Sequence, residues 1–175
     1  LPSADGRLPD MATLHATKSH FRLNRKNIAA EIEAQCRAFE RAFGRAPDYV
    51  DGHHHCQLVP VVQKTFLETV ARLAPKAWVR QCAPARKSAL ITAGNKTRYL
   101  GVLSLNFARL ARKIGVPVKP SFSGAYDYFG PQDFATLFPQ FLGELTEGGV
   151  MRCHHAFLAS ESFRLVMEKA EATLV

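Results

Sequence analysis

The sequence predicts an α/β fold in which helices cover a parallel β-sheet. Segments with helical periodicity alternate regularly with short β-prone segments. The connections between these segments are short, and this pattern favours parallel strands joined by crossover helices. The chain has 175 residues, of which 47% are hydrophobic and 22% charged. Those values are typical of one ordinary globular domain with a core of its own.

The first predicted elements are a helix, a short strand and a second helix. In NRKNIAAEIEAQCRAFERAFG, apolar residues recur at steps of three and four, which is helical periodicity. Asn27 is expected to cap the start of this helix and Gly44 to end it. RAPDYVDGH then predicts a loop, a short strand and a turn. The second helix should begin near Pro60, a residue favoured in the first helical turn, and end before Pro75.

The same alternation continues to the end of the chain. The later predicted elements are a strand in KAWVRQCAP, a helix over 96–114 stopped by Gly115, an extended segment KPSFSGAY, a Phe-rich helix from Pro131 to Gly148, a strand in GVMRCHH and a helix over 160–174. We interpret the phenylalanines of the helix that begins at Pro131 as core residues, because they recur on one helical stripe.

Composition argues against several classes of protein. The net charge is +8, but the basic residues are dispersed, and the densest basic run, RKSALITAGNKTR, lacks interleaved aromatic residues. We therefore expect no nucleic-acid partner. The hypothesis that the chain is an RNA-binding domain is supported by its charge alone. The four cysteines form no C-x-x-C pair, which predicts reduced thiols in the cytoplasm. No apolar run approaches the roughly 20 residues that a membrane span needs.

Histidines gather at the predicted ends of two strands. The first strand ends in VDGHHH and the last in MRCHH, and the strands between them end in VRQCAP and FSGAYDY. In parallel α/β sheets, ligands and catalytic side chains meet at the carboxyl ends of the strands. Neutral imidazole is a common ligand of zinc-like metals and is suited to proton transfer. Two histidine clusters on one rim therefore predict a site, although a single histidine there is more often a hydrogen-bonded turn residue.

The same rim offers further candidates, each with a structural alternative. Arg80 is expected to fix a substrate oxygen or an active-site carboxylate, or else to form a surface ion pair. Tyr126 and Tyr128 can stack on a sugar ring or pack in the core. Cys56 and Cys153 neighbour histidines, but a cysteine in a β-prone run is more often a small buried residue than a nucleophile.

Four stretches of the chain resemble, in order and spacing, the YdjC-like carbohydrate deacetylases. They are GRAPDYVDGHHHCQLVP, WVRQCAP, FSGAYDYFG and GGVMRCHHAFL. The family pattern has an Asp-x-His-x-His turn followed by a proline, then a strand bearing an arginine, and later a strand that ends in histidine. The resemblance implies an irregular (β/α) barrel. It also implies a divalent-metal-dependent hydrolase that removes an acetyl group from an N-acetylated sugar, either a chitooligosaccharide or a glycolipid.

The resemblance also implies roles for individual residues. His53 matches the family's metal-binding histidine, for a Mg²⁺ or Zn²⁺ ion, and His54 is expected to point away from the site. His154 matches the late histidine that protonates the leaving sugar amine. Asp51 matches the carboxylate neighbour of His53, His55 matches a recurrent position, and Arg80 matches the strand arginine. These three residues, together with Tyr126 as a ring that can stack on a sugar, are expected at the substrate.

The sequence departs from the family pattern at its beginning. The family starts with a strand ending in an Asp-Asp pair and continues to a Gly-Leu-His strand end, and neither motif occurs in this chain. LPSADGRLPDM resembles the segment just after them. We therefore expect residues 1–175 to form a single deacetylase-like domain without its first strands, whose open sheet edge can pair with another copy. The alternative is a non-catalytic remnant of the same barrel that binds a sugar or an anion.

Overall fold

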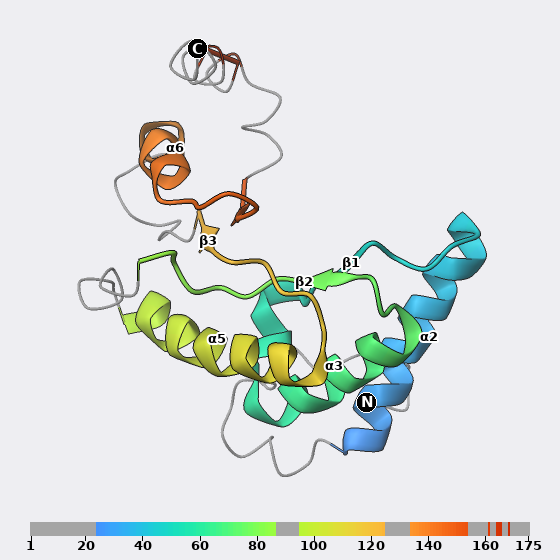
Figure 1. Ribbon diagram of the computed structural model, residues 1–175. Helices are drawn as coiled ribbons and strands as arrows, with labels where there is room; N and C mark the ends of the chain where they lie inside the picture. Colours follow the sequence, from blue (N-terminus) through green and yellow to red (C-terminus); the bar gives the residue numbers. More distant parts are fainter. Residues whose placement is uncertain are drawn as a thin grey trace, which may run out of the picture.

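The computed structural model describes residues 24–86, 95–124 and 134–153, together with positions 161, 164, 165 and 168 (Figure 1). The described part of the chain is a mixture of helices and short parallel strands, so the α/β class is confirmed. The expected irregular start, and most of the helix expected over 160–174, lie outside the described residues. No helix in the described ranges is long and apolar enough to cross a membrane.

The helices lie where the periodicity predicts them. They are α2 (Arg25–Phe43), α3 (Pro60–Leu73), α5 (Asn95–Ile114) and α6 (Phe134–Gly143), and a 3₁₀ segment, η1 (His53–Leu58), comes directly before α3. Asn24, rather than Asn27, caps α2, because its side chain accepts a hydrogen bond of 2.8 Å from the backbone N–H of Lys26. At the other end Gly44 adopts φ +68° and ends the helix as predicted.

The strands are short and run parallel. They are β1 (Tyr49–Val50), β2 (Trp78–Val79), β3 (Phe122–Ser123) and β4 (Val150–Met151). β1 pairs with β2, and β3 pairs with β4. A parallel bridge between Val79 and Val118, and a 3.0 Å hydrogen bond from the Phe122 N–H to the Ala83 carbonyl, join the two pairs. The four segments therefore lie side by side in chain order. The described residues close no barrel, so the barrel stays a prediction.

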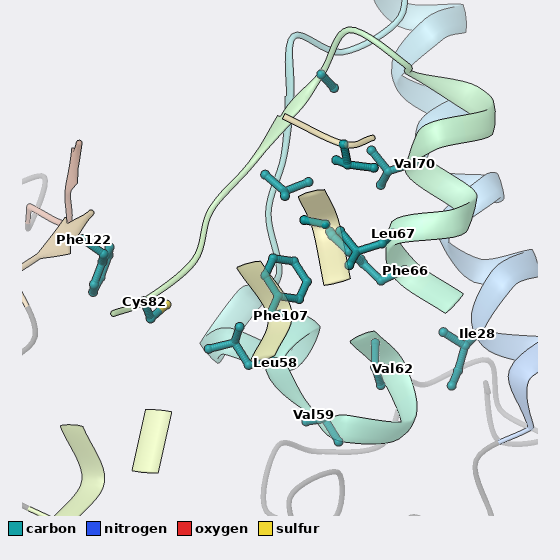
Figure 2. Close-up of a cluster of buried hydrophobic side chains, with 14 of the residues drawn as sticks. Ile28, Leu58, Val59, Val62, Phe66, Leu67, Val70, Cys82, Phe107 and Phe122 are labelled. Atoms are coloured by element: carbon teal, nitrogen blue, oxygen red, sulfur yellow. The ribbon is translucent and has the colours of Figure 1, made fainter. Parts of the chain in front are cut away.

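The main core lies between the strands β1, β2 and β3 and three of the helices. α3 contacts both α2 and α5, and apolar side chains from all of them meet under the strands (Figure 2). Phe107 of α5 is fully buried, and its ring centroid lies 6.0 Å from that of Phe66 of α3. Leu58 of η1 and Val79 of β2 are fully buried in the same cluster. The core thus fixes the segments that follow β1 and β2.

Gln63 of α3 ties this core to its neighbours through polar contacts. Its side-chain Nε2 donates to the carbonyl of Leu58 at 2.8 Å and to that of Leu103 at 3.2 Å. Its Oε1 accepts from the side chain of Asn106 at 2.7 Å. Because the Gln63 amide is buried with both of its ends paired, it stabilises the junction of η1, α3 and α5.

A second, smaller core lies under β4. Phe134, Phe138 and Phe141 of α6 are buried together, and Met151 and Cys153 pack against them. The interpretation of this Phe-rich helix as core is confirmed. The helix ends at Gly143, earlier than the predicted Gly148.

Candidate functional site

A cleft of about 370 Å³ opens where the strands end. Its walls come from the segments that follow β1 and β2, from Phe122 of β3, and from β4 with the two residues after it. Among its lining residues are Asp51, His53, His54, His55, Arg80 and Arg152. The structure therefore brings the first histidine cluster and the predicted arginine to one place. His154 and Tyr126 lie outside the described residues.

Arg80 is the centre of a hydrogen-bond network in the wall of this cleft. Its side chain is buried, and its Nε donates to Asp51 Oδ2 at 2.8 Å. Nη1 lies 3.0 Å from His55 Nδ1 and donates to Cys82 Sγ at 2.7 Å. Nη2 lies 3.4 Å from the Gly52 carbonyl. Of the alternatives for Arg80, the geometry agrees with an arginine that fixes a carboxylate and disagrees with a surface ion pair.

Asp51 uses both carboxylate oxygens to hold the turn after β1. Oδ1 accepts from the Gly52 N–H at 2.7 Å and from Gln57 Nε2 at 3.1 Å, while Oδ2 accepts from Arg80. Gln57 Nε2 also donates to the Arg80 carbonyl at 3.1 Å. Asp51 and Gln57 thus link the segment after β1 to the segment after β2.

Sequence reasoning missed Gln57, which is fully buried. The signal for it was a single amide residue in the apolar run CQLVP, since a polar side chain in such a run is normally hydrogen-bonded. Its Nε2 has the two partners described above, and its Oε1 has no hydrogen-bond partner among the described residues.

The three histidines line the cleft together because the backbone turns left-handed between them. His54 has φ +49° and His55 has φ +66°, whereas consecutive residues of an extended strand point to opposite faces. His54 therefore lines the cleft beside His53, contrary to the expectation that it points away. Their rings meet edge to face, with centroids 4.2 Å apart. This conformation costs about 1–2 kcal/mol for each non-glycine residue, and such strain clusters at functional sites.

Burial favours the protonated form of the cysteines near the cleft. Burial raises the pKa of Cys82 to about 12, and burial also raises the pKa of Cys56 and of Cys153. Since the thiolate is the reactive form, this arrangement does not favour a Cys-His nucleophile. It agrees with the alternative interpretation of these cysteines as small, partly or fully buried residues.

The described residues do not form a metal site by themselves. Within the described ranges, no three His, Cys, Asp or Glu side chains come together as metal ligands would. His53 is exposed in the cleft, but both oxygens of its neighbour Asp51 are held by Arg80, Gln57 and the Gly52 N–H. A metal ion at His53 would need further ligands from residues outside the described ranges.

Replacing Gly52 by alanine is expected to lower the free energy of unfolding by about 1–3 kcal/mol. A Cβ at Gly52 would lie 2.8 Å from the Gln57 backbone nitrogen and 2.9 Å from Cys56 Sγ, so the turn would have to shift. Urea denaturation followed by circular dichroism measures this change. Gly143→Ala is the matched control, because a Cβ there meets nothing within 4 Å. Equal unfolding midpoints for Gly52→Ala and the parent would contradict the prediction.

Comparisons with known proteins find one protein family and relatives that are named as deacetylases. A family model described as YdjC-like protein matches residues 1–173. A mouse protein named carbohydrate deacetylase is 32% identical over 88 residues, which cover 44% of this chain and 28% of the relative. Two proteins named chitooligosaccharide deacetylase are also similar. The one from Yersinia enterocolitica is 45% identical over 40 residues (23% of this chain, 16% of the relative). The one from Yersinia pestis is 36% identical over 62 residues (35% and 24%).

These matches span less than a third of the length of each of those relatives. No solved structure matches the chain.

Proposed function

This chain belongs to the YdjC-like protein family, and on that basis we propose that it is part of a hydrolase that removes the acetyl group from an N-acetylated sugar. The observation that carries the proposal is the cleft at the strand ends, in which His53, His54 and His55 lie beside the Arg80–Asp51 pair. The names of the relatives, carbohydrate deacetylase and chitooligosaccharide deacetylase, support the same chemistry. A chitooligosaccharide or an N-acetylated glycolipid is the substrate that we propose.

Hydrolysis of the acetamide forms one bond and breaks another. The oxygen of a water molecule bonds to the acetyl carbon while a carboxylate base takes a proton from that water; the C–N bond then breaks, the sugar amine takes a proton, and acetate leaves. We assign the donation of that proton to His154, because imidazole is suited to proton transfer. The Arg80–Asp51 pair holds the turn that carries His53 and His55 in place.

A divalent ion, Mg²⁺ or Zn²⁺, is part of the proposal. His53 would supply one ligand from the described residues, because its imidazole is exposed in the cleft and imidazole and carboxylate ligands suit such ions. The remaining ligands would come from outside the described ranges. We also assign the protein to the cytoplasm, since its four cysteines are free thiols.

The proposal predicts that the full-length protein releases acetate from N-acetylated chitooligosaccharides. Acetate is measured by a coupled enzymatic assay, with and without a chelator. We expect release to stop in the chelator and to return when Mg²⁺ or Zn²⁺ is added in excess. An N-acetylated glycolipid, tested in parallel in detergent, distinguishes the two classes of substrate.

Two results would count against this proposal. Binding of the oligosaccharide without any release of acetate would instead support the alternative, a non-catalytic barrel remnant that binds sugar. Acetate release unaffected by the chelator would contradict the metal dependence, but it would still support the proposed hydrolase activity.

A further inference from the structure

Gln57 joins the two ends of the segment that carries the three histidines, residues 52–56, which we call the histidine turn. Its side-chain Nε2 lies 3.1 Å from Oδ1 of Asp51, the residue directly before the turn. The same Nε2 lies 3.1 Å from the carbonyl oxygen of Arg80, on the segment after β2. Gln57 is fully buried, so both hydrogen bonds are shielded from water. One side-chain amide therefore closes the turn and joins it to the neighbouring strand segment.

The orientation of this amide follows from its neighbours. Asp51 Oδ1 and the Arg80 carbonyl both accept hydrogen bonds, so the group that faces them is the NH2 of Gln57 and not its oxygen. Oε1 then points toward Gly52, where the Cβ of any other residue would meet it. Oε1 has no hydrogen-bond partner among the described residues. The polar contribution of this side chain therefore comes from its two donors.

The histidine turn needs support because its backbone is strained. His54 and His55 have φ +49° and +66°, and residues other than glycine keep this conformation only where the surrounding structure compensates for it. The His55 N–H donates to the Gly52 carbonyl at 3.1 Å, and the Gly52 N–H donates to Asp51 Oδ1 at 2.7 Å. Because Gln57 donates to that same Oδ1, it fixes the acceptor on which the start of the turn depends.

We infer that Gln57 is a positioning residue whose side-chain amide holds the histidine turn in place at the wall of the cleft. Its effect on catalysis rests on the proposed sugar hydrolase, whereas its effect on the turn does not. Gln57 lies behind the cleft and is not one of its lining residues, so it acts through Asp51 and Arg80 and not on a substrate. Without its two donors the turn should open more often, while the main core stays packed.

The chain offers a matched control in Gln63. This residue is also buried, and its Nε2 also donates to two oxygens, the carbonyls of Leu58 and Leu103. These bonds hold the junction of η1, α3 and α5 and not the two ends of the histidine turn. Methionine has nearly the size of glutamine and lacks its donors, so Gln57→Met and Gln63→Met remove comparable hydrogen bonds at two different places.

Hydrogen exchange of backbone amides in the full-length protein measures the opening of the turn. Relative to the amide of Phe107 in the main core, we expect the Gly52 and His55 amides to exchange about ten- to a hundredfold faster in Gln57→Met than in the parent. The ratio removes any loss of global stability, which speeds all of these amides. Gln63→Met should leave the ratio close to that of the parent. An unchanged ratio in Gln57→Met would overturn the inference.

The wild-type protein gives a second measurement that needs no folded variant. Both protons of the Gln57 side-chain amide are bonded and buried, whereas the side-chain amide of Gln140 in α6 donates to Glu144 on an exposed surface. We expect the Gln57 NH2 to exchange at least about tenfold more slowly than the Gln140 NH2. Equal rates for the two side chains would refute the arrangement on which the inference depends.

The effect on catalysis is measured by acetate release at a temperature where both variants are folded. Because a small displacement of groups in a site is costly, we expect kcat of Gln57→Met to fall about ten- to a hundredfold. KM should change less, since Gln57 does not touch the substrate, and Gln63→Met should keep the kcat of the parent. Equal losses in the two variants would overturn the positioning role. Absence of acetate release from the parent would refute the hydrolase and leave the exchange results to decide the role of Gln57 in the turn.

Discussion

Replacing His53 by alanine is expected to reduce acetate release by the full-length protein at least about 100-fold. Loss of a residue that only supports a metal ligand typically costs 10–100-fold in metal affinity or activity, and His53 is proposed as a ligand itself. Its imidazole is exposed in the cleft at the end of β1. Steady-state acetate release measures the loss of activity. The metal content of the purified protein, measured by atomic emission, shows whether the metal ion is lost as well.

His54→Asn is the matched control for His53→Ala. His54 is also exposed, lines the same cleft and packs edge to face on His53. Asparagine accepts the left-handed backbone of that position, so the turn should keep its shape. We expect the metal content of His54→Asn to equal that of the parent. If His53→Ala kept both the metal and the activity of the parent, the assignment of His53 would be wrong.

Replacing Phe107 by alanine is expected to lower the free energy of unfolding by about 3–5 kcal/mol. The side chain is fully buried in the main core, and Figure 2 shows its ring in the middle of that cluster. Truncation removes the transfer free energy of the ring and leaves a cavity that neighbours such as Phe66 and Leu58 fill only partly. The midpoint of urea denaturation, with the slope of the transition checked for two-state behaviour, measures the loss.

The control for Phe107 lies on the same helix. Val102 of α5 is 57% exposed, so Val102→Ala should change the free energy of unfolding by no more than about 0.5 kcal/mol. Similar losses in the two variants would show that burial in the main core is not what makes Phe107 important.

The helices and the parallel arrangement were predictable because each depends on local pattern. The apolar steps of three and four in α2, and the position of Pro60 at the start of α3, can be read from a single segment. The cap of α2 was misassigned because Asn24 and Asn27 are equally suitable by residue type. Which of them caps the helix depends on where the first helical turn begins, and residue type alone does not decide that.

The interior of the site was only partly predictable. Because functional side chains meet at the carboxyl ends of parallel strands, the sequence predicted that VDGHHH and Arg80 lie near one another. It did not predict which groups they contact. The contacts of Arg80 with Asp51 and Cys82, and of Gln57 with both walls, join residues whose neighbourhood is created by the packed core. The left-handed backbone at His54 and His55 was also not foreseeable, because histidine adopts it only when the surrounding structure compensates for the strain.

The separation between the core and the cleft has a consequence for how this protein can evolve. Phe107 and its neighbours lie in the main core, while the residues available for recognition stand where the strands end. New ligand preferences can therefore arise by exchange of rim residues such as His54 or Arg152 without repacking the interior, as is usual where loops carry function on a rigid scaffold. Arg80 and Phe122 are exceptions, since both are buried and both line the cleft. A substitution of Arg80 is therefore expected to affect both the stability of the fold and the properties of the cleft.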